Sequence, residues 1–381
     1  YKYEDKDIFT LNFDNYGSPT IKLLTNNYDG MANYVKAGEY IIEDYNQWLI
    51  EQDYNAMGNG VFYGRMGLCI YWFQQFLLYS NCKYKIVANK LLEEVVSNIG
   101  SYSTVGFENG IIGILNTVND LVEKNCILTN EKSFFRPLED KIFQYMSSCL
   151  FEIGMDRKED LADLIWACRY FCFRINSGKL SLENEIIMKR LIMASINKVE
   201  EKLRNPNLII EQQKQFLPFS NILSNLVVLI EDMYKLNMFT YKLNMLCREM
   251  ATLCKLYLPS QGLNHSLLLS NIASLVKTNP KLKKCFSKIF SPTLPICDLS
   301  VFSECKGLTL YLRDGLSGLL YNLRRTDVDE KLMLFFSNKI REKVADKKTS
   351  WKNPTNFILG NSMTGVFYTY QKLFAYEENR Y

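Results

Sequence analysis

Four residues of this sequence offer acid–base or charge-stabilising chemistry. His265 is the only histidine among 381 residues, and an imidazole with an unperturbed pKa near neutrality can both accept and donate a proton. Arg313 and Asp314 stand directly before Gly315. A guanidinium can stabilise a developing anion, and a neighbouring carboxylate can orient a partner. Asp160 is a further carboxylate. Side chains of these types can transfer protons and stabilise anions where the fold brings them together.

Metal-ligating side chains are sparse. Eleven cysteines are scattered through apolar segments, and no two are spaced as Cys-x-x-Cys, the spacing typical of zinc sites. An unconventional zinc site would need His265 with cysteines such as Cys297 or Cys305. Cys168 and Cys172 are four residues apart among aromatic residues, which predicts core packing rather than ligation. We therefore expect neither a metal nor another cofactor.

An internal repeat indicates the elements that position these residues. Its form is a polar residue, a glycine, two further residues, a second glycine and an apolar run. The clear copies are Tyr63-Gly64-Arg65-Met66-Gly67, Asn109-Gly110-Ile111-Ile112-Gly113, Asp314-Gly315-Leu316-Ser317-Gly318 and Ser362-Met363-Thr364-Gly365. Weaker copies start at Leu164, Asn221 and Ser266. The seven copies recur about every fifty residues, which suits two helices of about fifteen residues each with their connections.

The segments between the copies predict amphipathic helices. Apolar residues three and four apart alternate with charges in Tyr84 to Ile99, Leu138 to Ile153 and Glu185 to Leu203, which is the pattern of a helix with one buried face. Asp29 to Gln52 is expected to hold one or two helices. The fold class is therefore all-α. Glycines at helix starts are expected to allow close helix approach and to leave helix N–H groups open towards a common centre.

The repeat resembles that of the lanthionine synthetase C-like (LanC-like) family, from about Met57 to Leu373. The resemblance implies an α,α-toroid, a double ring of helices built from seven helical-hairpin repeats. It would comprise residues 57–381, with residues 1–56 as an N-terminal extension packed on the toroid. Enzymes of this family add a peptide cysteine thiol to a dehydrated serine or threonine and close a thioether ring.

Residues of the family's active site are replaced here. The family holds zinc with a Cys in the fifth motif and a Cys-His pair before the glycine of the sixth. Asn264 stands at the first of these positions, and Arg313 and Asp314 stand at the other two. Ser220 replaces the family's catalytic histidine, whereas Asp160 matches an acidic residue of the third motif. The chain is thus similar to the cyclase domains of class III lanthionine synthetases, which lack the zinc ligands.

The first functional hypothesis is a zinc-independent lanthionine cyclase that acts on a dehydrated precursor peptide. A base must deprotonate the peptide thiol, and an acid must protonate the enolate that follows addition. His265 is the candidate for one of these roles, Arg313 would stabilise the thiolate or the enolate, and Asp314 or Asp160 would orient a partner. The expected substrate-binding residues are Tyr63, Asn109, Asn264 and Ser220.

Two alternatives stay open. A catalytically degenerate member could bind a precursor or leader peptide and present it to another modification enzyme, such as a kinase or lyase, fused or separate. Tyr63, Phe107 and Trp351 would then lie near the cavity rim. A glycoside-processing toroid would instead need paired carboxylates, for which Asp163 and Asp314 are candidates together with Asp160.

Composition narrows the range of partners. Lys and Arg number 45 against 41 Asp and Glu, and a net charge of +4 is too small to predict nucleic-acid binding. The longest apolar stretches, such as Leu223 to Ile230, are too short to span a membrane. With no secretory signal before Tyr1 and many unpaired thiols, we expect a cytoplasmic protein.

Overall fold

The computed structural model describes residues 29–99, 104–127, 131–151, 158–212, 214–257, 262–287, 289, 309–323, 330–346, 351–353 and 356–378. Across these ranges the chain is mainly α-helical, and it forms no β-strand, only isolated parallel bridges between Gly58 and Gly64 and between Thr309 and Gly315. The predicted all-α class is confirmed. Within the described ranges, no helix has the length and apolar character needed to cross a membrane.

The helices of the described residues follow one another along the chain. They are α1 (Asp29–Ile50), α2 (Arg65–Tyr79), α3 (Cys82–Asn98), α4 (Ile111–Glu123), α5 (Glu131–Phe151), α6 (Lys158–Asn176), α7 (Leu182–Leu203), α8 (Pro206–Gln212), α9 (Ile222–Lys235), α10 (Thr240–Tyr257), α11 (Leu263–Thr278), the 3-10 helix η3 (Pro280–Leu282), α12 (Lys283–Phe286), α14 (Leu316–Asn322), α15 (Glu330–Ala345) and α16 (Met363–Glu378). The expected amphipathic segments overlap α3, α5 and α7.

The chain divides into two compact units between Gln47 and Trp48, within α1. The described part of the first unit is the helical segment 29–47, so the segment from Asp29 to Gln52 holds one helix. The division lies nine residues before the boundary expected after residue 56. The packing of an N-terminal extension on the second unit stays a prediction.

Two kinds of helix alternate in the second unit. In α3 the buried residues are Tyr84, Ala88, Leu91 and Val95, a single face at helical spacing. In α2, by contrast, every residue from Met66 to Phe73 is buried, and α9 is buried almost throughout. A helix that is apolar on all sides must be surrounded by protein. Helices of the α2 kind therefore form the interior of the unit, and helices of the α3 kind cover them.

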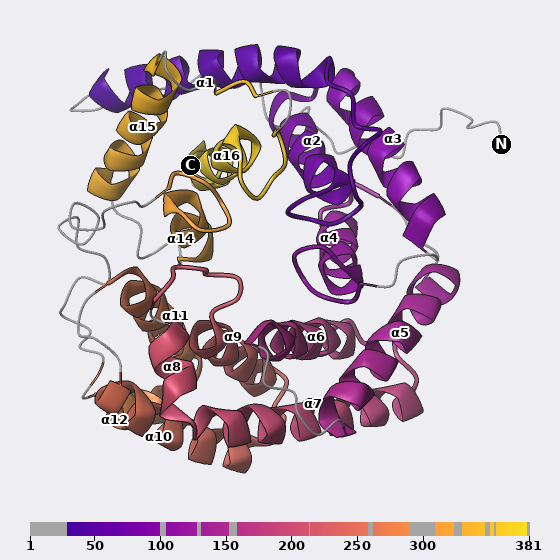
Figure 1. The fold of residues 1–381 in the computed structure, drawn as a ribbon, viewed down its shortest axis with the longest axis vertical. Coiled ribbons are helices and arrows are strands. Elements are labelled where there is room, and N and C mark those ends of the chain that lie inside the picture. The colour runs from indigo at the N-terminus through magenta and orange to yellow at the C-terminus, as the bar shows by residue number, and fades with distance from the viewer. Residues whose placement is uncertain are drawn as a thin grey trace. The chain divides into compact units, whose positions relative to one another are not determined.

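Each interior helix packs on the next one along the chain. The packed pairs are α2 with α4, α4 with α6, α6 with α9, α9 with α11, α11 with α14, α14 with α16, and α16 with α2 (Figure 1). The last pair joins segments almost three hundred residues apart in sequence. The buried amides of Gln75 and Gln371 are hydrogen-bonded to each other across it. The series of contacts therefore returns to its start.

The repeated glycines have a steric role. A Cβ atom on Gly67 would lie 1.9 Å from the carbonyl oxygen of Val61, and one on Gly113 would lie 1.9 Å from that of Phe107. A Cβ atom on Gly318 would lie 2.1 Å from the Leu312 carbonyl oxygen, and one on Gly365 would lie 2.0 Å from that of Leu359. In all four cases the carbonyl belongs to the residue six positions earlier. No side chain fits at these distances, so the second glycine of each clear copy lets the preceding loop fold against its own helix.

The same loops bond the first N–H groups of the helices. Arg65 N–H donates to the Gly58 carbonyl at 2.8 Å, and Ile111 N–H donates to the Thr104 carbonyl at 3.0 Å. The corresponding bond in α14, from Leu316 to Thr309, is 2.9 Å long. The expectation that these N–H groups point open to a common centre is therefore wrong for α2, α4 and α14. In each helix, the N–H of the first residue is bonded to the carbonyl of the loop residue seven positions earlier.

Most copies of the repeat mark helix starts. Gly64, Gly110, Asn221 and Gly315 are N-cap residues, and α16 begins directly after Ser362. The third and fifth copies differ. Helix α6 begins at Lys158, six residues before the third copy, and α11 begins at Leu263, three residues before the fifth. Gly262, the N-cap of α11, has a positive φ of 129°, a conformation that favours glycine.

Candidate functional site

The loops before the interior helices meet one another through backbone hydrogen bonds. Gly360 N–H donates to the Phe62 carbonyl at 2.9 Å, Phe62 N–H donates to the Glu108 carbonyl at 2.9 Å, and Arg313 N–H donates to the Gly360 carbonyl at 2.9 Å. These bonds bring together loops that precede α2, α4, α14 and α16. Side chains on the loops are thereby held by rigid backbone.

Four of these side chains, Tyr63, Glu108, Ser220 and Arg313, form what we name the loop cluster. Arg313 Nε lies 3.0 Å from Glu108 Oε2, and Ser220 Oγ donates to Glu108 Oε1 at 3.3 Å. The Arg313 guanidinium carbon lies 5.5 Å from the centre of the Tyr63 ring. The cluster thus centres on an ion pair between loops about two hundred residues apart.

Sequence reasoning missed Glu108. Glu108 and Arg313 each stand two residues before the first glycine of a clear copy, so residues of opposite charge occupy one position of the repeat. A comparison of the copies position by position would have singled out both residues, but it would not have paired them. A carboxylate is also favoured there because the positive end of the α4 dipole lies nearby.

The ion pair keeps the loop cluster in one protonation state. Burial lowers the pKa of Arg313, but the Coulombic attraction and hydrogen bond of Glu108 outweigh burial and raise the pKa overall. Burial raises the pKa of Tyr63, and the Arg313 charge offsets only part of this rise. At neutral pH the guanidinium is therefore charged and the phenol neutral, so neither is a ready proton acceptor.

The remaining expected site residues have other partners. Asp314 Oδ1 accepts a 2.7 Å hydrogen bond from Thr309 Oγ1 in its own loop. Asn264 is buried and donates to the Gln212 and Gln215 carbonyls at 3.2 and 3.1 Å, and its Oδ1 accepts from the Asn221 amide. Asn109 is exposed, and its Cα and Oδ1 pack against Gly60. Asn264 therefore ties elements together in the core.

His265 lies in the first turn of α11. It is half-buried, and its Nδ1 atom is buried with no hydrogen-bond partner. Burial lowers its pKa, so the imidazole is neutral at pH 7. No hydrogen bond or ion pair in the described ranges joins it to Arg313 or Asp314. Asp160 lies in α6, but its side chain is outside the described part.

The residues at the family's zinc positions do not fit zinc. A guanidinium engaged by a carboxylate stands at one ligand position, and the amide of Asn264, engaged by backbone carbonyls, stands at another. No three His, Cys, Asp or Glu residues among those described are placed to share a metal ion. Cys297 and Cys305 lie outside the described residues.

The described cysteines are free thiols, and most of them are buried. Burial raises the pKa of Cys168 to about 12 and raises that of Cys172 well above its usual range. A thiol with such a pKa stays protonated and is neither a nucleophile nor a metal ligand at neutral pH. Cys168 and Cys172 are 1% and 2% exposed, which confirms that they belong to the core.

A cavity of about 630 Å³ lies among the interior helices, and we name it the central cavity. Helices α2, α4, α6, α9, α11, α14 and α16 all contribute to its lining. Its floor is formed by apolar loop residues four positions before the first residue of a helix: Val61, Phe107, Pro218, Leu312 and Leu359. These are buried, whereas Asp120, Arg169 and Lys372 further along the helices are half-buried. The cavity therefore opens at the end remote from the loops.

Four aromatic rings cross the cavity from α6 to α14, and we name them the aromatic strip. Trp166 and Phe107 are stacked with ring centroids 3.8 Å apart, Phe107 and Phe219 lie 5.9 Å apart, and Phe219 and Tyr321 lie 5.7 Å apart. A cation stands at each end. The Arg169 guanidinium is 4.1 Å from the Trp166 ring centre, and Lys372 Nζ is 3.5 Å from that of Tyr321.

The strip was only partly anticipated. Phe107, expected near the rim, lies in the cavity floor, whereas Tyr63 and Trp351 do not line the cavity. Nothing in the local sequence distinguishes Trp166, Phe219 and Tyr321 from other aromatic core residues. Their side chains become neighbours only in the folded structure.

Comparison with protein-family models and with curated proteins finds no match for this chain.

Proposed function

We propose that residues 57–381 form an α,α-toroid of the LanC-like type, built from seven helical-hairpin repeats. The order of helix contacts, in which α16 packs back on α2, supports this architecture. The second glycine of each clear copy supports it as well, because the same glycine-to-carbonyl approach recurs at Gly67, Gly113, Gly318 and Gly365.

On this architecture we infer that the protein binds a peptide in the central cavity and presents it to another enzyme of ribosomal peptide modification, such as a kinase or lyase. The central cavity is the observation that carries this proposal. Its volume falls within the range of about 300–1,000 Å³ usual for ligand pockets. Its lining combines aromatic rings with the amides of Asn116 and Asn271. Their Nδ2 groups donate to the Ile112 and Ser224 carbonyls, and their oxygens can accept from peptide N–H groups.

The loop cluster supports binding more than catalysis. Arg313 is paired with Glu108 through Nε, so the carboxylate already offsets its charge. Freeing Asp314 would break its bond to Thr309. Both residues therefore serve the loops that close the cavity floor.

The test is retention of a mixed set of N-acetylated octapeptides by the purified protein. Val228 lines the cavity from α9, so Val228→Trp should fill the cavity and abolish retention. Val96→Trp adds the same ring to an exposed position on α3 and should bind as wild type does. Circular dichroism would verify that both variants are folded. Retention that survives Val228→Trp would refute the cavity as the binding site.

A second candidate is a zinc-independent thioether cyclase, favoured by the state of His265. A neutral, half-buried imidazole could accept the proton of a peptide thiol. The sulfur would then bond to the β-carbon of a dehydroalanine, the electron pair would move to the carbonyl as an enolate, and the α-carbon would take up a proton. The atoms balance without an oxidant or a metal.

This candidate is tested with a peptide that contains one dehydroalanine and one cysteine. Cyclisation leaves the peptide mass unchanged but prevents later alkylation by iodoacetamide, which mass spectrometry detects. Loss of alkylation with wild type, at a rate reduced at least tenfold by His265→Gln, would establish the cyclase. A peptide that is bound yet remains fully alkylatable would leave only the binding function.

No observation favours glycoside processing. Asp163 Oδ1 accepts the Phe107 N–H at 2.8 Å, and Asp314 is bonded within its own loop. These carboxylates fasten loops, and we do not propose that they act on a sugar.

A further inference from the structure

The charges of the central cavity lining do not balance. Asp120 is paired with Lys124 at 2.6 Å. Arg169 is paired with Asp232 at 3.6 Å and also approaches the Asn225 amide. Lys372 is the remaining charged residue of the lining, and no carboxylate of the described residues forms an ion pair with it. One uncompensated positive charge therefore stands in the cavity wall.

The position of this charge is fixed by aromatic contacts. Lys372 Nζ lies over the Tyr321 ring at 3.5 Å, and Tyr321 is stacked with Tyr368 at 5.9 Å. A cation held on an aromatic face is partly desolvated and kept in place. Because Lys372 is half-buried near the open end, its remaining N–H groups can meet a ligand that enters the cavity.

We propose that the central cavity selects peptide segments in which a carboxylate adjoins an aromatic or apolar residue. The carboxylate pairs with Lys372, and the neighbouring side chain lies on the aromatic strip. This inference deepens the proposed binding function and rests on it. The carboxylate can come from an acidic side chain or from a peptide C-terminus, since both offer the same two acceptor oxygens.

Three N-acetylated hexapeptides with the same apolar and aromatic residues test this selectivity. The first carries an internal glutamate and an amidated C-terminus, the second has glutamine in place of the glutamate, and the third is the second peptide with a free C-terminal carboxylate. Calorimetric titration at 50 mM salt would give their affinities. We expect the glutamate peptide to bind at least tenfold tighter than the glutamine peptide, and less so at 500 mM salt. The third peptide shows whether a terminal carboxylate also serves.

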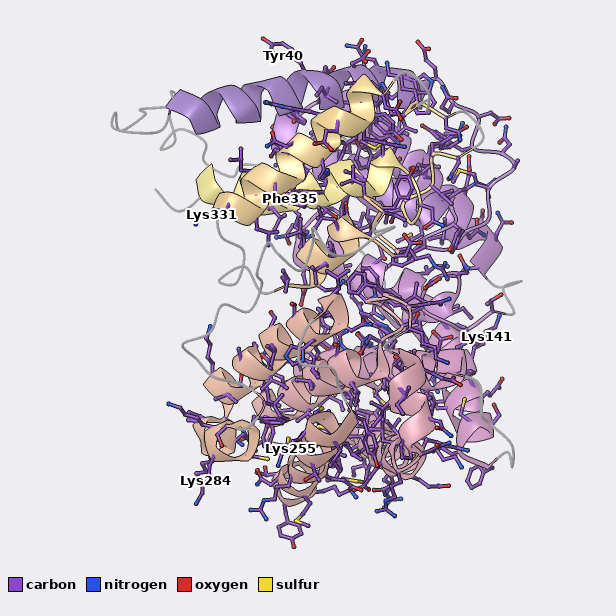
Figure 2. All side chains as sticks on the ribbon, turned by 60° about the vertical axis from the view of Figure 1, so that its left-hand side comes forward. Tyr40, Lys141, Lys255, Lys284, Lys331 and Phe335 are labelled. Carbon is purple, nitrogen blue, oxygen red and sulfur yellow. The ribbon has the colours of Figure 1, made fainter. Side chains whose placement is uncertain are left out.

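Lys372→Met removes the charge and keeps the unbranched apolar stem that packs on Tyr321. It should erase the preference for glutamate and leave the affinity of the glutamine peptide unchanged. The matched control is Lys284→Met on α12, whose exposed side chain extends away from the ribbon (Figure 2). This variant loses the same charge and should keep the preference.

The outcomes separate the two proposals. Equal affinity for all three peptides, or a preference that survives Lys372→Met, would overturn the carboxylate selectivity while cavity binding stood. If no peptide bound wild type, or if Val228→Trp bound them all unchanged, the proposed binding function itself would fail.

Discussion

At the residue scale, the ion pair between Arg313 and Glu108 is the feature most open to measurement. The two side chains are 31% and 20% exposed, so solvent screens the pair only in part. In a double-mutant cycle with Glu108→Gln and Arg313→Met, we expect a coupling free energy of about 1 kcal/mol. Urea unfolding of the four proteins measures it.

The exposed pair of Lys339 and Glu342 on α15, 44% and 63% exposed, provides the control cycle. Its coupling should be close to zero. If the Arg313 pair coupled no more strongly than this surface pair, the loop cluster would not fasten the loops as described.

His265 makes stability depend on pH. Burial lowers its pKa in the folded protein below the ordinary value of 6.5. Below that value the unfolded chain binds a proton that the folded chain does not, so stability falls as the pH drops from about 6.5 towards the folded pKa. Unfolding free energies at pH 7.5 and 5.5 should therefore differ more for wild type than for His265→Gln, by at most about 1.4 kcal/mol per pH unit.

Because His265 is the only imidazole, its proton NMR signal can be titrated directly. A midpoint at or above 6.5 would contradict this account of the residue.

Candidate residues could be predicted from the sequence only where the repeat marks them. Arg313 and Asp314 stand out because they precede a clear glycine copy, but Asn264 could not be recognised as a core residue. Its three hydrogen bonds reach segments that lie 43 to 52 positions away. The partner of Arg313 was missed because an ion pair between positions 108 and 313 has no local signal.

At the scale of the elements, the second glycine of each clear copy is predicted to be irreplaceable. Gly67→Ala would place a Cβ atom 1.9 Å from the Val61 carbonyl, which forces the loop away from α2. We expect a loss of about 2 kcal/mol or more in unfolding free energy. Thermal and urea unfolding measure this loss.

The same position in α9 is occupied by Ser224, which provides a matched control. Its Cβ is already accommodated, and its hydroxyl is buried without a hydrogen-bond partner. Ser224→Ala should therefore change stability by less than about 1 kcal/mol. Similar losses for the two variants would show that the glycines are not required for close approach.

The presence of a helix could be predicted from the sequence more reliably than the residue at which the helix begins. The segments α3, α5 and α7 follow from charge and apolar spacing alone, since each has one solvated face. Helix α6 has no glycine copy to mark its start at Lys158, and its interior position removes the amphipathic pattern as well. Its first turn therefore could not be placed from the sequence.

At the scale of the second unit, the contact between α2 and α16 closes the series of interior helices. Gln371→Leu would remove the amide that is hydrogen-bonded to the buried amide of Gln75, which we expect to cost about 1–3 kcal/mol. The double variant Gln75→Leu with Gln371→Leu should recover much of that loss, because neither buried amide then remains. Losses that simply add in urea unfolding would mean that the two helices are not packed together in solution.

The crystal structure of the protein with the amidated glutamate hexapeptide tests the central claim most directly. We predict density for the peptide in the central cavity, with an apolar or aromatic side chain on the aromatic strip and the glutamate carboxylate within hydrogen-bond distance of Lys372 Nζ. A peptide bound at the loop cluster or on the outer helices, with the central cavity empty, would contradict the claim.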